Sequence, residues 1–160
     1  MVFEKASIED ISELVDLRTE YLLEDHGEIP QNKLSLIADS LPYYFTNHLN
    51  KDLIAFVCRD KGKILGCCFL YISEKPSSPS FINGRTGTVM NVYTRPQFRK
   101  RGIARELMKM LLSESKNKKL DHVELKATDS GYSLYKSLGF EDTISKYHNM
   151  KYIIDCQDTN

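Results

Sequence analysis

The spacing of apolar residues divides the chain into helical and extended segments. Apolar residues recur every three to four positions, the spacing of a half-buried helix, over residues 8–22, 34–45 and 103–118. Short stretches rich in Val, Ile, Phe and Tyr predict strands at 2–5, 53–59, 63–73, 85–94, 121–127 and 147–154. A short helix is expected over 130–138. Because a helix separates the strands at 85–94 and 121–127, these two should be parallel, whereas the earlier strands form hairpins. The pattern therefore predicts a mixed sheet with flanking helices.

Several single residues sharpen the expected boundaries. Ser7 is a suitable N-cap, and Asp10 stands where a capping box would carry Glu or Gln. Pro42 falls inside the helix expected over 33–50 and should kink or divide it. Gly66 interrupts a strand, which indicates a bulge or a close backbone approach. Gly139 suits the position just after a helix end.

Length and charge are those of one ordinary globular domain. We expect residues 1–160 to form a single domain, with 155–160 as a polar tail. The formal net charge of +0 argues against a nucleic-acid partner. The sequence contains no bilayer-length apolar run and no signal peptide, so we expect a cytoplasmic protein without a membrane partner. Its cysteines and histidines lack metal-ligand spacing, so no metal is predicted.

The segment between the strand at 85–94 and the helix that begins at Ile103 carries the clearest chemical signal. About four amides at a helix start lack intrahelical partners, and the helix dipole is positive there. Arg99, Lys100 and Arg101 add positive charge, while Gly102 permits a tight turn. This arrangement is suited to a pyrophosphate. Two other interpretations of the basic cluster stay open, a solvated surface and a nucleic-acid patch.

Two motifs resemble the GNAT superfamily of acetyl-CoA-dependent N-acetyltransferases. The run Arg99-Lys100-Arg101-Gly102-Ile103-Ala104 is similar to its Arg/Gln-x-x-Gly-x-Gly/Ala signature. The segment 125–140, which ends in Leu-Tyr-Lys-Ser-Leu-Gly-Phe, is similar to a second family element. Motifs of ordinary NTPases and dinucleotide-binding enzymes are absent from the sequence.

The resemblance implies a fold and an activity. The fold would be an α/β (α+β) GNAT-like one, with a central mixed, mostly antiparallel sheet, splayed parallel strands and flanking helices. The activity would be direct transfer of the acetyl group of acetyl-CoA to a primary amine of a small molecule or peptide. Two alternatives stay open, namely a non-catalytic acyl-CoA-binding module and a nucleic-acid-binding domain. The partners would be acetyl-CoA and an amine acceptor, and a homodimer is also open.

The resemblance also implies which residues form the site. Tyr135 fills the slot of the tyrosine that protonates the departing thiolate. The expected cofactor-binding residues are Val92, Tyr93, Thr94, Arg99, Lys100, Arg101, Gly102, Ile103, Ala104, Arg105 and Thr128. Thr128 is a departure, because many relatives have an Asn there.

No residue clearly serves as the base that deprotonates the acceptor. Some relatives use a Glu on the central strand, but residues 86–94 contain no carboxylate. A water chain polarised by Asn91 or by backbone carbonyls, or a Glu from the first helices, would have to serve. The family also uses the segment after the first strand to shape the acceptor site, which draws attention to Glu24, Asp25, Glu28, Tyr43 and Tyr44.

Overall fold

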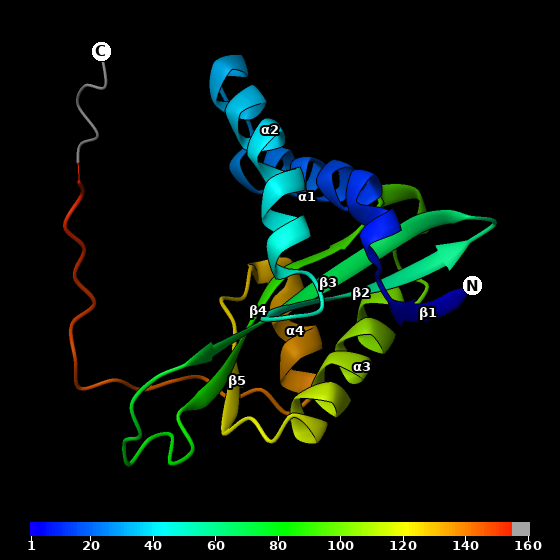
Figure 1. Cartoon of the computed structure of the whole chain (residues 1–160). Helices are drawn as coiled ribbons and strands as arrows, with labels where there is room; N and C mark the ends of the chain where they lie inside the picture. Colours follow the sequence, from blue (N-terminus) through cyan, green and yellow to red (C-terminus); the bar gives the residue numbers. More distant parts are fainter. Residues whose placement is uncertain (155–160) are drawn as a thin grey trace.

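A five-stranded sheet forms the centre of the computed structural model, which describes residues 1–154 (Figure 1). The strands lie in chain order, and they are β1 (Val2–Lys5), β2 (Leu53–Asp60), β3 (Lys63–Glu74), β4 (Arg85–Thr94) and β5 (His122–Glu124). Neighbours from β1 to β4 are antiparallel, whereas β5 is parallel to β4. The predicted mixed sheet is therefore confirmed.

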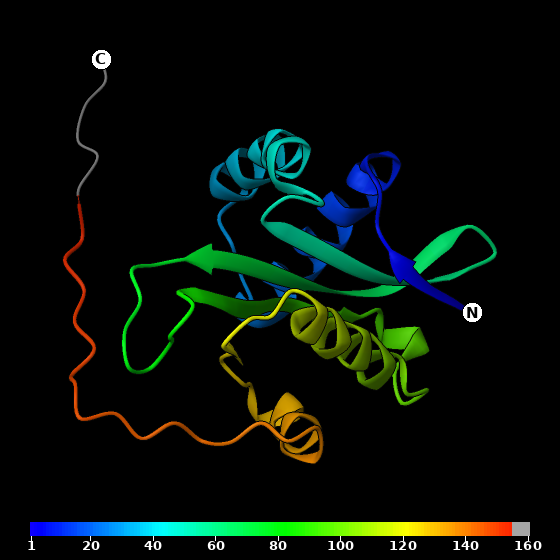
Figure 2. The same ribbon diagram turned by 60° about the horizontal axis from the view of Figure 1, so that its bottom comes forward.

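Helices cover both faces of this sheet, as Figure 2 shows. The helices α1 (Ile11–His26) and α2 (Gln31–His48) lie on one face, and α3 (Ile103–Asn117) and α4 (Asp129–Ser137) lie on the other. Two short 3-10 helices, η1 (Ile8–Asp10) and η2 (Pro96–Phe98), precede α1 and the loop before α3. The helix η2 therefore lies between the end of β4 and the basic loop.

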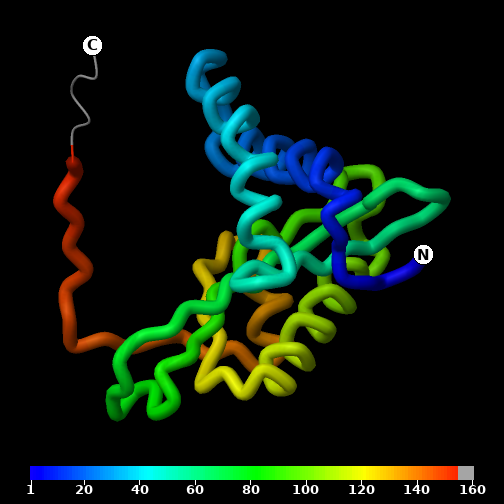
Figure 3. Tube along the Cα trace, in the orientation of Figure 1, coloured from blue at the N-terminus to red at the C-terminus, as the bar shows by residue number. Residues whose placement is uncertain are grey.

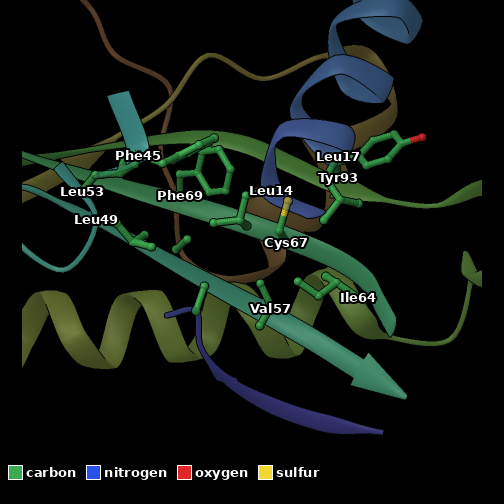
Figure 4. Close-up of a cluster of buried hydrophobic side chains, with 12 residues drawn as sticks. Leu14, Leu17, Phe45, Leu49, Leu53, Val57, Ile64, Cys67, Phe69 and Tyr93 are labelled. Atoms are coloured by element: carbon green, nitrogen blue, oxygen red, sulfur yellow. The ribbon is translucent and has the colours of Figure 1, made fainter. Parts of the chain in front are cut away.

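Each face of the sheet has its own hydrophobic cluster. Leu14 and Leu17 of α1 and Phe45 of α2 are buried in the first, where Phe45 meets Phe69 edge to face with ring centroids 5.7 Å apart (Figure 4). The second cluster packs α3 against the opposite face, with Met108 fully buried. Because both faces are covered, β2 is a continuous apolar run from residue 53 to 58 rather than an alternating one.

The structure confirms the roles predicted for Ser7 and Asp10 at a helix start, for Gly66 at a close approach of two strands and for Gly139 at a helix end. The Ser7 hydroxyl accepts from the Glu9 amide at 3.2 Å, and the Asp10 carboxylate accepts from the Ser7 amide at 2.8 Å. A Cβ on Gly66 would lie 2.8 Å from the Tyr93 carbonyl oxygen, so that close approach requires glycine. Gly139 has φ +93° at the end of α4, where only glycine is unstrained.

One prediction of secondary structure is wrong, and one of the two effects predicted for Pro42 is excluded. Pro42 does not divide α2, which is continuous from Gln31 to His48. Pro42 is exposed, so water can satisfy the helix carbonyl that lacks an amide partner. The strand predicted over 147–154 is not formed, because this extended segment pairs with no other strand in the described chain. The proposed tail at 155–160 lies outside the described residues.

Candidate active site

The strands β4 and β5 separate soon after they meet. They pair only at Thr86–His122, Gly87–Val123 and Thr88–Glu124, and β5 ends at Glu124 rather than at the predicted residue 127. Within residues 1–154, the edge of β4 from 89 to 94 therefore has no strand beside it on that side. An extended polar ligand could hydrogen-bond to this free edge.

A bulge in β4 changes the direction of the strand within this free edge. Its register against β3 shifts near Asn91, which has φ +52° and is 3% exposed. Arg18 donates to the Asn91 side-chain oxygen at 3.1 Å, and the Asn91 amide group donates to the Cys67 sulfur at 3.3 Å. Burial raises the pKa of the Cys67 thiol to about 12, so this partner stays neutral. The Asn91 side chain therefore fixes the bulge.

The loop after β4 exposes a run of unpaired backbone donors. Lys100 and Gly102 adopt left-handed conformations, with φ +60° and +78°, and Gly102 is the N-cap of α3. In the described part of the chain, the amides from Lys100 to Arg105 donate to no backbone or side-chain acceptor, and α3 has no side-chain cap. Such a cluster at a helix start binds anions. The residues present thus fit a pyrophosphate group.

A cavity of about 530 Å³ lies between this loop, the end of β4 and α4. It brings together Tyr135 and every predicted cofactor-binding residue except Arg101: Val92, Tyr93, Thr94, Arg99, Lys100, Gly102, Ile103, Ala104, Arg105 and Thr128. The Arg101 guanidinium lies over the Phe98 ring, 5.4 Å from its centroid. The Thr128 hydroxyl accepts from the Gly131 amide at 3.3 Å and so caps α4.

Helix α1 contributes a wall that the sequence motifs did not reveal. Tyr21, Glu24 and Asp25 line the cavity, and of these the family resemblance points only to the two carboxylates, which it places on the acceptor side. Glu24 accepts a hydrogen bond from Arg99, and Glu20 forms an ion pair with Arg95 at 3.2 Å. These contacts span 75 residues of sequence, so no local signal could have shown them.

The other residues considered for the acceptor side lie elsewhere. Two cavities adjoin in this region, and Glu28, Tyr43 and Tyr44 line neither of them. Tyr43 is 77% exposed, and Tyr44 stacks on His48 with ring centroids 4.3 Å apart. Further lining residues that the motifs did not indicate are Phe98, Ser130, Gly131 and Leu134.

A second cavity of about 660 Å³ adjoins the first across the free edge of β4. Its walls include residues 88–92 of β4, 124–126 at and after β5, and the end of α1. Tyr135 lines both cavities, and the residues that both share besides it are Tyr21, Asp25, Val92 and Thr128. Burial, with smaller contributions from Cys68 and Tyr21, raises the pKa of Tyr135 to about 12. At neutral pH a protonated phenol therefore lies where the two cavities meet.

Comparison with known proteins identifies the family of this chain. Residues 51–142 match the family model described as the acetyltransferase (GNAT) domain. The chain belongs to the GNAT acetyltransferases. The match includes β4, the basic loop, α3 and α4, which form the first cavity together with α1.

Solved structures support the GNAT assignment. A predicted acetyltransferase from Clostridium acetobutylicum, crystallised with acetyl-CoA, is 29% identical, with a TM-score of 0.81 over 94% of this chain and 95% of that one. A GCN5-related N-acetyltransferase from Ralstonia eutropha JMP134 is 24% identical, with a TM-score of 0.76 over 93% and 97% of the two chains, and it shows the shared fold. A comparison with curated proteins finds no match.

Membership in the GNAT family supports acetyl transfer with acetyl-CoA as the cosubstrate. Across residues 1–154, no three His, Cys, Asp or Glu side chains are grouped to hold a metal ion. No helix in that range is long and apolar enough to span a membrane.

Proposed function

We propose that this GNAT protein transfers an acetyl group from acetyl-CoA directly to a primary amine of a small molecule or peptide. The observation that carries the proposal is the position of Tyr135, where an anion-binding cavity meets a second cavity. In this arrangement the first cavity would hold the cosubstrate and the second the acceptor. The two reactants would meet at one phenol, as direct transfer requires.

The cofactor side of the site would rely mainly on backbone groups. The amides of Lys100 to Arg105 would hold the pyrophosphate, helped by the charges of Lys100, Arg101 and Arg105. The free edge of β4, from Val92 to Thr94, would pair with the amides of the pantetheine arm. The Thr128 hydroxyl, which already caps α4, would contact the same ligand through its remaining hydrogen-bonding capacity.

Tyr135 would act as the general acid. Bound acetyl-CoA supplies a thioester carbonyl that an amine can attack, with the coenzyme thiolate as the leaving group. The Tyr135 phenol would give its proton to that sulfur as negative charge develops, and the high pKa keeps the proton available at neutral pH. Tyr135 lines both cavities, so its hydroxyl can turn toward the sulfur of the bound cosubstrate.

Asp25 would receive the acceptor ammonium, which gives up a proton to water before the neutral amine attacks the thioester. It lines both cavities, and its carboxylate lies 3.6 Å from the His26 ring, a pair that is charged only when the histidine is protonated. The neighbouring Glu20 and Glu24 are paired with arginines, which are always charged. We therefore expect Asp25→Asn to raise KM for the amine several-fold, since an ion pair contributes about 0.5–1 kcal/mol or more when partly desolvated. KM for acetyl-CoA should change little. Asp16→Asn, an exposed change on the same helix, is the matched control, and equal effects of the two variants would exclude Asp25 from this role.

A free-thiol assay with acetyl-CoA and a panel of primary amines tests the proposed activity. We expect thiol release that depends on the amine, together with a gain in mass of one acetyl group on the acceptor. The missing carboxylate on β4 favours the alternative, an acyl-CoA-binding module without turnover. Binding of acetyl-CoA without thiol release across small and peptide amines would establish that alternative.

A further inference from the structure

Arg18 lines the second cavity and has no counter-ion in the described chain. It lies on α1, which packs against β4 and β3 on one face of the sheet (Figure 3). Its guanidinium donates to the Asn91 side-chain oxygen and lies over the Tyr21 ring, 5.5 Å from the centroid. The two other arginines near this site, Arg95 and Arg99, each pair with a glutamate of α1. Arg18 is therefore a charge whose partner is not supplied by residues 1–154.

The guanidinium of Arg18 also has unused hydrogen-bond donors. An arginine side chain carries five N–H donors and is always charged, and the bond to Asn91 is the one that Arg18 donates within the described residues. Arg18 is half-buried, whereas the other cations that line the second cavity, His26 and Lys126, are exposed. Partial burial makes a charge costly to leave unpaired. The free donors therefore fit an anion that enters the cavity.

The other charges of the second cavity favour a carboxylate over a phosphate as this anion. The planar guanidinium binds a carboxylate through two parallel hydrogen bonds. Asp25 and Glu124 also line the cavity, and their negative charges would repel a phosphate dianion more strongly than a carboxylate. One half-buried cation balances one carboxylate.

The distance from Arg18 to Asp25 limits the length of the bound molecule. The two residues lie seven positions apart on α1, which corresponds to about 10 Å along the helix axis. Hydrogen bonds of about 3 Å at each end leave about 5 Å between the amine and the carboxylate of a bound acceptor. Tyr21, Leu22 and Met90 line the same cavity, so its wall suits a short chain of methylene groups.

We propose that Arg18 determines acceptor specificity by selecting amines that carry a carboxylate at the far end of a short methylene chain. This inference rests on the proposed acetyl transfer, because it names the class of amine that the second cavity would take. Asp25 would hold the ammonium near Tyr135, and Arg18 would hold the carboxylate. The two contacts would orient the amine toward the thioester.

Arg18 itself would make and break no covalent bond. The acceptor ammonium would lose one proton to water, and its nitrogen would form the bond to the acetyl carbon. The carbon–sulfur bond would break, and the departing thiolate would take the proton of Tyr135, as in the transfer proposed above. The new amide nitrogen would lose its second proton to water. Arg18 would remain bound to the acceptor carboxylate throughout.

A pair of matched acceptors tests the role of Arg18. The molecules 4-aminobutanoate and butylamine have the same chain and amine, but only the first has a carboxylate. We expect kcat/KM of the parent protein to be about 10–100-fold higher for 4-aminobutanoate, the usual size of a hydrogen bond between charged groups. In Arg18→Gln this ratio should fall toward one. A loss of stability would affect both acceptors alike and would leave the ratio unchanged.

Lys126→Gln is the matched control, because it removes an exposed cation from the same cavity. Its ratio of the two kcat/KM values should stay close to that of the parent. Arg18→Lys, which keeps the charge but loses the planar fork, should restore part of the preference. A parent ratio near one, or a preference for 4-aminobutanoate that survives Arg18→Gln, would overturn the proposal.

Binding of butanoate separates this inference from the proposed activity. Butanoate has no amine, so its binding reports on the anion site without any acetyl transfer. With coenzyme A bound, ligand-observed NMR should show butanoate binding to the parent and about tenfold weaker binding to Arg18→Gln. Such binding without thiol release from any amine would support the anion site and exclude the transfer. Equal transfer to both amines, with no binding of butanoate, would support the transfer and exclude the role of Arg18.

Discussion

Tyr135 shows how one side chain gains its chemical character from its position. Its ring packs edge to face with Phe140, with centroids 6.0 Å apart, in the cluster beneath the sheet. This burial, more than any neighbouring charge, raises the pKa of the phenol to about 12. A phenol with this pKa keeps its proton throughout the physiological range, so the proton is present when negative charge develops on the coenzyme sulfur.

We expect Tyr135→Phe to lower kcat by about 10²–10⁴-fold, the usual size of general-acid assistance. The dissociation constant of acetyl-CoA should change little, because one neutral hydrogen bond contributes about 0.5–1.5 kcal/mol. Steady-state kinetics with an active amine and calorimetry with coenzyme A would measure the two effects. Tyr43→Phe is the control, because Tyr43 is exposed and lines neither cavity. Parental turnover by the Tyr135 variant would leave this residue a packing role only.

Gly102 is required for its backbone conformation rather than for space. A Cβ at this position would meet no atom within 4 Å, but φ is +78°. The strain of a left-handed non-glycine residue is about 1–2 kcal/mol, and it is higher for a β-branched one. Gly102→Val should therefore weaken binding of acetyl-CoA about tenfold or more, and Lys100→Ala should weaken it less. Titration calorimetry compares the two, and equal losses would mean that side-chain charge rather than loop shape governs binding.

At the scale of secondary structure, side chains of α1 contact both the β4 bulge and the segment around η2, which lie next to the proposed cofactor site. Arg18 contacts the β4 bulge through Asn91, and Glu20 and Glu24 contact the arginines on either side of η2. All three α1 residues lie within two turns of the helix. The helix, the bulge and the loop should therefore move as one unit.

Removal of the Arg18 contact tests this connection. Arg18→Met keeps most of the apolar stem but leaves the buried Asn91 oxygen without its donor. An unsatisfied buried acceptor costs about 1–3 kcal/mol, so the free energy of unfolding should fall by that amount in urea denaturation. Ser12→Ala, an exposed change on α1, should have almost no effect. Equal stabilities for Arg18→Met and the parent would show that the bulge holds its shape without α1.

The sequence predicted those features that depend on residues close together along the chain. The loop from Arg99 to Gly102 and the boundaries of β4 were predictable because strand, turn and helix signals follow one another directly. The Glu24–Arg99 pair was not, since it depends on how α1 packs against residues 75 positions away. The prediction of a strand over 147–154 is wrong for a related reason. Alternating apolar and polar residues indicate that a segment can form a strand, but a strand also needs a neighbouring strand to pair with.

At the scale of the whole molecule, the net charge of zero argues against binding of nucleic acid but does not conflict with binding of a cofactor. The 22 basic residues are matched by 22 acidic ones, and Glu24 pairs with Arg99 inside the basic cluster itself. A duplex would therefore meet little net positive field. A ligand held by backbone amides needs no such field.

Coenzyme A should raise the melting temperature by mass action. At 100 times its dissociation constant the gain is about 2.7 kcal/mol, which corresponds to about 5–10 °C for a domain of this size. A random DNA duplex at moderate salt should cause no shift. Differential scanning fluorimetry with both ligands would measure this. A shift with DNA and none with coenzyme A would overturn the assignment of the basic loop.

The pairing of Glu24 with Arg99 also determines how the site should respond to ionic strength. Phosphates that approach the loop meet a guanidinium already neutralised by a carboxylate, so they gain less from it than from a free cation. Salt screens exposed charges but has little effect on backbone amides inside a cavity. Affinity for the cosubstrate should therefore decline only gently as salt rises, although the sequence places three cations side by side.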